Sequence, residues 1–216
     1  MALGGTGAAV AATQPLAIVN HDTRALSKAT GGSKPVARVK ATRPITGGPT
    51  VLPVISRHTD ARGGRWVRVL LPGRPNSRTG WIPARAVTPV ATTWTITIRV
   101  STRQVTAVRA GRPARTFRAV VGTPATPTPL GRFFVEEIVE LDRLDVGAPY
   151  ALALSARSEV LQEFAGGPGQ VAIHGTSNIG GMLGSAASHG CVRLDTKAIN
   201  WLAAHVGPGV PVTITR

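Results

Sequence analysis

The sequence has a single cysteine, Cys191, among its 216 residues. One thiol excludes an intramolecular disulfide and any metal site built only from cysteines. Aromatic residues make up 4% of the chain, so aliphatic side chains must fill most of the core that a hydrophobic content of 43% can support. No stretch approaches the length of apolar sequence that a membrane-spanning helix needs, and we therefore expect no transmembrane segment.

Acidic residues are scarce in the first part of the chain. Residues 1–135 hold 20 Lys and Arg but only Asp22 and Asp60, whereas residues 136–216 hold five basic and eight acidic residues. These counts give +18 and −3, which together make the net charge of +15. A basic N-terminal half predicts a docking surface for a polyanion, such as nucleic acid or an anionic cell-wall polymer. The excess of 21 Arg over four Lys is also what genomic base composition alone would produce, without any binding role.

The N-terminus carries no visible export signal, because Met1–Ala17 is rich in Ala and Gly and lacks a basic leading region. Residues 1–33 are small and polar and end in Gly31-Gly32-Ser33. Such composition predicts a flexible tail or linker over 1–33.

Residues 34–90 predict a small β domain. Trp66–Leu70 alternates apolar and charged residues as a half-buried strand does, and Gly80–Pro83 returns after a loop rich in Pro and Gly. This order of a Trp strand, a Gly-containing loop and Gly-Trp-Ile resembles the bacterial SH3-like modules attached to cell-wall enzymes. A β domain with no binding role is the alternative. We place a domain boundary at Pro89–Thr93.

Residues 93–216 predict a second domain, mainly β with one helix. Trp94–Val100 has clean period-two alternation with β-branched residues. Further short apolar runs predict strands at Val105–Val108, Phe117–Val121, Arg132–Ile138, Tyr150–Leu154, Val171–Ile173 and Val210–Ile214.

The predicted helix follows Cys191 in the sequence. One apolar face is formed by Ile199, Leu202, Ala203 and Val206, which follow the helical spacing. Asp195 or Thr196 is placed to cap its start, and Gly207-Pro208 to end it.

Chemistry is indicated around Cys191, which has His189 two residues before it and His174 on a predicted strand. A thiol becomes a strong nucleophile when a base such as imidazole removes its proton. Spacing alone leaves three interpretations open: a nucleophile, an inert buried thiol, and a zinc site formed by the three side chains with a bound water.

For the nucleophile, other groups near Cys191 have natural roles. The N–H groups of Gly190 and Cys191 can face a developing oxyanion. Arg193 can bind a substrate carboxylate or lower the thiol pKa. No acid lies near His174 in the sequence, so a backbone carbonyl such as that of Gly175 would fix its tautomer.

The motifs His174-Gly175 and Ser188-His189-Gly190-Cys191-Val192-Arg193-Leu194 resemble the signature of the L,D-transpeptidase catalytic domain. The segment from Gly122 to Phe133 with Thr128-Pro129-Leu130-Gly131, then Pro149-Tyr150-Ala151-Leu152, and the closing Gly209–Ile214 extend the similarity over about 93–216.

This resemblance implies a β-sandwich-like catalytic fold and no cofactor or metal. It implies Cys191 as nucleophile, His174 as its base and acid, and Gly175 as the residue whose carbonyl orients it. His189 and Gly190 would complete the catalytic set. The substrate would be bound by Ser188, Arg193, Thr176 and Tyr150. The region between Gly131 and Tyr150 is short where relatives carry a lid, which bears on acceptor preference.

The implied reaction joins peptidoglycan stem peptides through a cysteine thioester and releases D-alanine. Water or a free amino acid as acceptor would make the protein an L,D-carboxypeptidase or an exchange enzyme. A third alternative is a non-catalytic wall-binding protein that uses its basic N-terminal half. Nucleic acid is disfavoured because the sequence has no aromatic stacking platform or helical reading motif. The substrate implies a location outside the cytoplasm, in the periplasm or cell wall.

Overall fold

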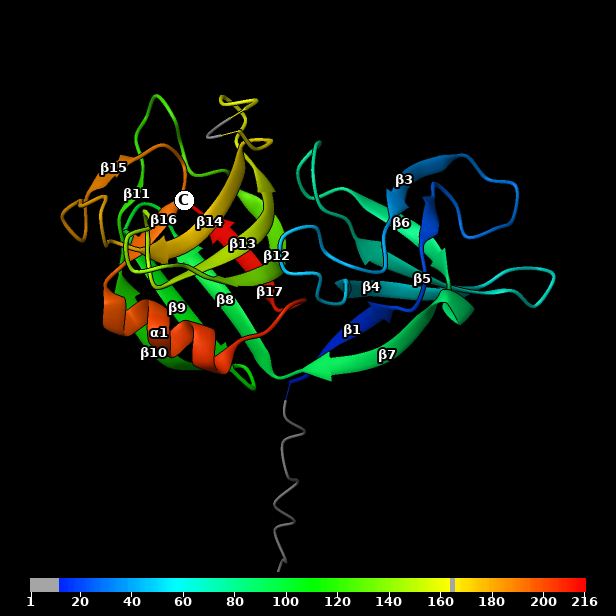
Figure 1. The fold of residues 1–216 in the computed structure, drawn as a ribbon. Helices are drawn as coiled ribbons and strands as arrows, with labels where there is room; N and C mark the ends of the chain where they lie inside the picture. Colours follow the sequence, from blue (N-terminus) through cyan, green and yellow to red (C-terminus); the bar gives the residue numbers. More distant parts are fainter. Residues whose placement is uncertain (1–11, 164–165) are drawn as a thin grey trace, which may run out of the picture.

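The computed structural model describes residues 12–163 and 166–216. The chain forms two β-rich lobes side by side, one from the N-terminal half and one from the C-terminal half (Figure 1). We call residues 14–92 the N-terminal lobe and residues 94–215 the C-terminal lobe. The predicted mainly-β class is confirmed, and among the described residues the only α-helix is the one expected after Cys191.

The N-terminal lobe is one antiparallel sheet of seven strands in the order β3-β2-β6-β5-β4-β1-β7. A short 3-10 helix, η1 (Ala84–Ala86), precedes its last strand. The strands are β1 (Gln14–Val19), β2 (Thr23–Leu26), β3 (Pro35–Val39), β4 (Val51–Thr59), β5 (Arg65–Leu70), β6 (Thr79–Pro83) and β7 (Val87–Thr92).

One prediction for this half is wrong. Much of the expected flexible tail is sheet: β1 pairs with both β4 and β7, and Leu16, Ala17 and Val19 are buried. Burial of these apolar side chains offsets the conformational entropy that the backbone loses. The small, polar composition of the segment therefore did not indicate that it forms a strand. The prediction for residues 1–11 lies outside the described residues. The expected boundary at Pro89–Thr93 contains the junction between the lobes, because Thr93 alone separates β7 from β8, although Pro89–Thr92 belong to β7.

The C-terminal lobe is an eight-stranded sheet in the order β10-β9-β8-β17-β12-β13-β14-β16, with a small parallel pair, β11 and β15. The pairs β8·β17 and β14·β16 are parallel and the other pairs of the large sheet are antiparallel. The strands are β8 (Trp94–Arg99), β9 (Gln104–Arg109), β10 (Arg112–Arg118), β11 (Val121–Gly122), β12 (Gly131–Glu140), β13 (Tyr150–Arg157), β14 (Gln170–Gly175), β15 (Ala186–Ser188), β16 (Val192–Leu194) and β17 (Pro211–Thr215).

Most of the predicted strands of this lobe are confirmed within a few residues. The exception is Phe117–Val121, where β10 ends at Arg118 and β11 begins at Val121, with a break between them. Helix α1 (Thr196–His205) is capped as expected by Asp195, whose Oδ1 accepts from the Ala198 N–H at 2.8 Å.

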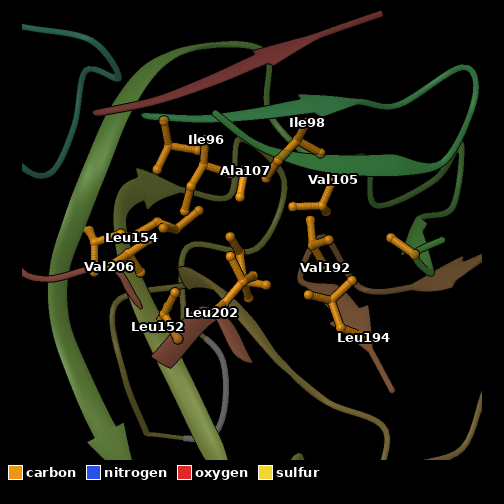
Figure 2. Close-up of a cluster of buried hydrophobic side chains, with 14 of the residues drawn as sticks. Ile96, Ile98, Val105, Ala107, Leu152, Leu154, Val192, Leu194, Leu202 and Val206 are labelled. Atoms are coloured by element: carbon orange, nitrogen blue, oxygen red, sulfur yellow. The ribbon is translucent and has the colours of Figure 1, made fainter. Parts of the chain in front are cut away.

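The core of the C-terminal lobe is mostly aliphatic, as the shortage of aromatic residues predicts. Figure 2 shows Ile96 and Ile98 of β8, Leu152 and Leu154 of β13, and Leu202 of α1 converging in it. Val192 and Leu194 of β16 belong to the same cluster. The strand that follows Cys191 is therefore fixed by the core.

The two lobes are joined by buried contacts as well as by Thr93. Phe134 of β12 is 1% exposed and packs in the core of the N-terminal lobe, whereas its neighbour Phe133 packs in the C-terminal core. Glu137 accepts from the backbone N–H groups of Ile45 and Thr46, at 3.2 and 2.8 Å. One strand therefore contributes to both cores.

No helix in the described part of the chain is long and apolar enough to cross a membrane.

Because Phe134 fills the core of the lobe to which it does not belong in sequence, Phe134→Ala should lower the free energy of unfolding by about 3–5 kcal/mol. Chemical denaturation followed by tryptophan fluorescence measures this loss. Leu144→Ala, at a side chain that is 82% exposed, serves as the control and should change stability by less than about 0.5 kcal/mol. Equal effects of the two substitutions would contradict the shared core.

Candidate active site

The parallel pairing of β14 with β16 arranges the predicted site. Ile173 lies opposite Val192, and His174 lies opposite Arg193. Successive side chains of a strand point to opposite faces, so His174 and Arg193 share one face while Ile173 and Val192 point into the core. Cys191 immediately precedes β16, and the same alternation directs its side chain to the face that holds His174.

The imidazole of His174 is oriented by the main chain. Its Nδ1 lies 2.8 Å from the carbonyl oxygen of Gly175. A carbonyl only accepts, so Nδ1 carries the proton and Nε2 is left as the basic nitrogen. The side chain is 8% exposed, and burial lowers the His174 pKa below its usual value, opposed by the Gly175 bond and assisted by the charge of Arg193. The orienting carbonyl predicted from the sequence is therefore present.

Gly147 packs directly against this imidazole and was not identified from the sequence. A Cβ at this position would lie 2.4 Å from His174 Nδ1, and its φ of +88° is a conformation that glycine adopts freely. Its carbonyl accepts from the Gly175 N–H at 2.8 Å. The only sequence signal was a glycine just before Ala148-Pro149, which is typical of any turn.

The Cys191 thiol is partly enclosed and receives one polar contact. The Ala172 N–H points at Sγ with an N···S distance of 3.4 Å. Burial raises the thiol pKa, and the Ala172 hydrogen bond and the charge of Arg193 oppose this rise. With the His174 pKa lowered and the Cys191 pKa raised, the resting pair is a neutral thiol and a neutral imidazole near pH 7.

A tight turn from Ser188 to Cys191 presents the thiol. The Ser188 hydroxyl donates to the Cys191 carbonyl and accepts from the Gly190 N–H at 3.1 Å. Gly190 has φ +116°, which a residue with a side chain rarely adopts. The expected use of the Gly190 N–H for an oxyanion is not supported, because that N–H is engaged inside the turn.

Arg193 is a buried cation, 6% exposed, beside the thiol and the imidazole. Its Nη1 donates to the carbonyl of Gly180 at 3.4 Å, and within the described residues its Nε has no hydrogen-bond partner. Burial lowers the Arg193 pKa, and interaction with Cys191 opposes that change. Its charge favours a thiolate at Cys191 and disfavours an imidazolium at His174.

The remaining predicted residues lie around this centre in different settings. His189 is exposed and lines a hollow of about 20 Å³ together with Cys191, Ser158, Leu161, Gly169, Gln170 and Val171. Thr176 is half-buried and starts the turn after β14, where its carbonyl accepts from the Gly180 N–H at 3.1 Å. Tyr150 packs against the C-terminal core, so its role on the substrate stays a prediction.

The zinc alternative finds no support in the geometry. Across residues 12–163 and 166–216, no three His, Cys, Asp or Glu side chains lie close enough together to hold a metal ion. The trio His174, His189 and Cys191 is therefore not arranged as a ligand set.

The raised thiol pKa predicts how Cys191 reacts with a small alkylating reagent such as iodoacetamide. Its rate should be low at pH 7 and rise with pH, with a midpoint above that of a cysteine in a short unfolded peptide of the same local sequence. Mass spectrometry of the labelled protein measures the rate, and Cys191→Ser provides the unlabelled baseline. A rate that is already maximal below pH 7 would indicate a resting thiolate–imidazolium pair and contradict the neutral pair.

Comparison with known proteins supplies the family. The family model YkuD, described as the L,D-transpeptidase catalytic domain, matches residues 93–214. A Bacillus subtilis (strain 168) protein named as an L,D-transpeptidase, YkuD, is 28% identical over 151 residues, which are 68% of this chain and 74% of that protein.

Solved structures of L,D-transpeptidases are also similar. One from Mycobacterium tuberculosis H37Rv is 17% identical with a TM-score of 0.48, and covers 77% of this chain and 90% of its own. The catalytic domain from E. faecium is 23% identical with a TM-score of 0.42, and the match covers 56% of this chain and 96% of that domain. Because the family model matches more than half of the residues, the chain belongs to the YkuD family of L,D-transpeptidase catalytic domains.

Proposed function

We propose that this protein is a peptidoglycan L,D-transpeptidase that cross-links stem peptides through a thioester on Cys191. The observation that carries the proposal is the placement of the thiol and a tautomer-fixed imidazole on one face of the β14·β16 pair. Family membership supports the same reaction class. A peptidoglycan substrate places the activity outside the cytoplasm.

In the first step, Sγ of Cys191 attacks the carbonyl carbon of the diamino-acid residue in a tetrapeptide stem. The thiol proton moves to Nε2 of His174, and a carbon–sulfur bond forms. His174 then gives this proton to the nitrogen of the terminal D-alanine as the carbon–nitrogen bond breaks. D-alanine leaves, and the stem remains as a thioester.

In the second step, the side-chain amine of another stem attacks the thioester. A new carbon–nitrogen bond forms, the carbon–sulfur bond breaks, and His174 carries the amine proton back to the sulfur. The lowered pKa of His174 suits this cycle, because the imidazole rests as a base and holds a proton only between bond-making and bond-breaking.

The surrounding residues have distinct proposed roles. Gly175 keeps Nε2 of His174 basic through its carbonyl. Ser188 and Gly190 hold the turn that presents the thiol, and the backbone N–H of Cys191 is the proposed oxyanion donor. Arg193 stabilises the thiolate formed during attack and thioester breakdown.

His189, Thr176 and Tyr150 are proposed to contact the stem peptide at the margin of the site. His189 is the best placed of the three, because it lines the hollow beside the thiol.

Intact mass after incubation with a carbapenem, and with a purified tetrapeptide stem, tests the nucleophile. A related E. faecium catalytic domain has been solved acylated by ertapenem. Wild type should gain one adduct, Cys191→Ala none, and Cys191→Ser should turn over at least about 10³-fold more slowly. An adduct of the same mass on folded Cys191→Ala, or none on folded wild type, would overturn the proposal.

The products identify the acceptor. Cross-linked dimers report a stem amine, a tripeptide reports water, and a stem with a new terminal residue reports exchange. The latter two would reassign the protein as an L,D-carboxypeptidase or an exchange enzyme that uses the same thioester.

The basic N-terminal half is proposed to hold the enzyme on anionic wall polymers. Binding of the full chain to purified wall polymer should fall steeply between 50 and 500 mM salt, because ions screen exposed charges. Cys191→Ala should bind as wild type does. Binding that is independent of salt would contradict an electrostatic role, and binding without any acylation would favour a non-catalytic wall protein.

A further inference from the structure

A loop of the N-terminal lobe reaches the wall of the thiol site. The loop between β5 and β6 holds Arg74, whose guanidinium donates to three carbonyl oxygens of the C-terminal lobe. Nη2 reaches the carbonyls of Ser158 and Leu161 at 2.7 and 3.0 Å, and Nη1 reaches the carbonyl of Pro168 at 3.0 Å. One side chain thus clamps two stretches of backbone that are several residues apart in sequence.

Those two stretches line the hollow at Cys191. Ser158 and Leu161 of the first stretch and Gly169 of the second line the same space as the thiol. We call Ser158–Leu161 and Pro168–Gly169 the wall segments. The Ser158 N–H donates to the Gly169 carbonyl at 2.8 Å, so the two wall segments are also tied to each other. A shift of either segment changes the shape of the space beside the nucleophile.

The N-terminal lobe holds Arg74 in place through its neighbours on the loop. Asn76 pairs with the backbone of Arg157 in both directions, donating from Nδ2 at 2.8 Å and accepting at Oδ1 at 2.9 Å. Ser77 makes the same kind of two-way contact with the backbone of Arg132, at 3.0 Å each way. The Gly73 N–H donates to the Ser155 carbonyl at 3.3 Å. The loop is therefore docked on the C-terminal lobe at four of the five positions from Gly73 to Ser77.

The docking also has an electrostatic cost that is offset locally. Arg74 lies near Arg157, and burial together with this like charge lowers the pKa of Arg157 to about 10. Glu136 compensates, because its Oε1 accepts from Arg157 Nη1 at 3.0 Å and from Gln170 Nε2 at 3.2 Å. Gln170 lines the hollow as well. Two sets of contacts from the lobe interface therefore reach residues that line the hollow beside Cys191.

We propose that Arg74 is a positioning residue for acylation: by clamping the wall segments, it lets the N-terminal lobe support the surface that orients the stem peptide at Cys191. This inference rests on the proposed function. Arginine suits the position because its planar fork serves several carbonyls at once, which the single ammonium of lysine does not reproduce. Acylation depends on orientation at the ångström scale, so a released wall slows acylation by a bulky peptide more than reaction with a small reagent.

The test compares Arg74→Ala and Arg74→Lys with wild type in the full-length chain. Acylation by the tetrapeptide stem should slow about tenfold or more in Arg74→Ala and less in Arg74→Lys. Alkylation of Cys191 by iodoacetamide should keep its pH midpoint, because the imidazole and thiol are untouched. Arg62→Ala removes the same charge from an exposed turn and should leave all rates unchanged.

Hydrogen exchange separates the clamp from the proposed reaction. Peptides spanning residues 156–163 and 166–172 should exchange faster in Arg74→Ala, whereas peptides from β8 and β9 should not. Acylation within twofold of wild type, or unchanged exchange in both wall segments, overturns the inference. If wild type forms no acyl adduct, the proposed function fails and the exchange result still decides whether Arg74 holds the wall. If Arg74→Ala does not fold, Arg74→Lys is judged by the same two readouts.

Discussion

The site depends on the pairing of β14 with β16. This short parallel pair sends Ile173, Val192 and Leu194 into the aliphatic core and leaves His174 and Arg193 on the opposite face. The core therefore fixes the register, and the register fixes which side chains share the face that holds His174. A slip of one residue would turn His174 or Arg193 into the aliphatic core and turn core side chains to the opposite face, so the packing that stabilises the lobe also specifies this arrangement.

The environment of the pair favours neutral groups at rest. Burial raises the pKa of the thiol and lowers the pKa of the imidazole, while the Gly175 carbonyl sets the tautomer and Gly147 encloses the ring. In the proposed reaction, charge then develops only when a carbonyl carbon is present to receive the sulfur. Such a resting state exposes little thiolate to adventitious oxidants and electrophiles.

Sequence reasoning identified the family and most of the C-terminal strands, but less of the N-terminal lobe. Some features can be predicted from residues that are neighbours in the sequence. These are the motif around Cys191, the strand at Trp94 and the helix cap at Asp195. The burial of β1 cannot be predicted in this way, because Gln14–Val19 becomes a strand through pairing with β4 and β7, which are distant in sequence. The roles of Gly147 and Arg74 were equally hidden, since each acts on backbone brought near by the fold. Gly190 looked like an oxyanion donor until its N–H was found inside the turn.

The position of Phe134 affects whether the two lobes of this protein can be separated from each other. The family match begins at residue 93. Strand β12, however, buries Phe133 in the core of the C-terminal lobe and the next side chain, Phe134, in the core of the N-terminal lobe. A fragment cut at the family boundary would expose that ring and the Glu137 carboxylate without their partners. Glu136 would lose its ion pair with Arg43 and keep the one with Arg157. The family-matched part of this chain therefore depends on the N-terminal lobe to bury Phe134. A recombination event that replaced the N-terminal lobe would have to provide another apolar pocket for this side chain.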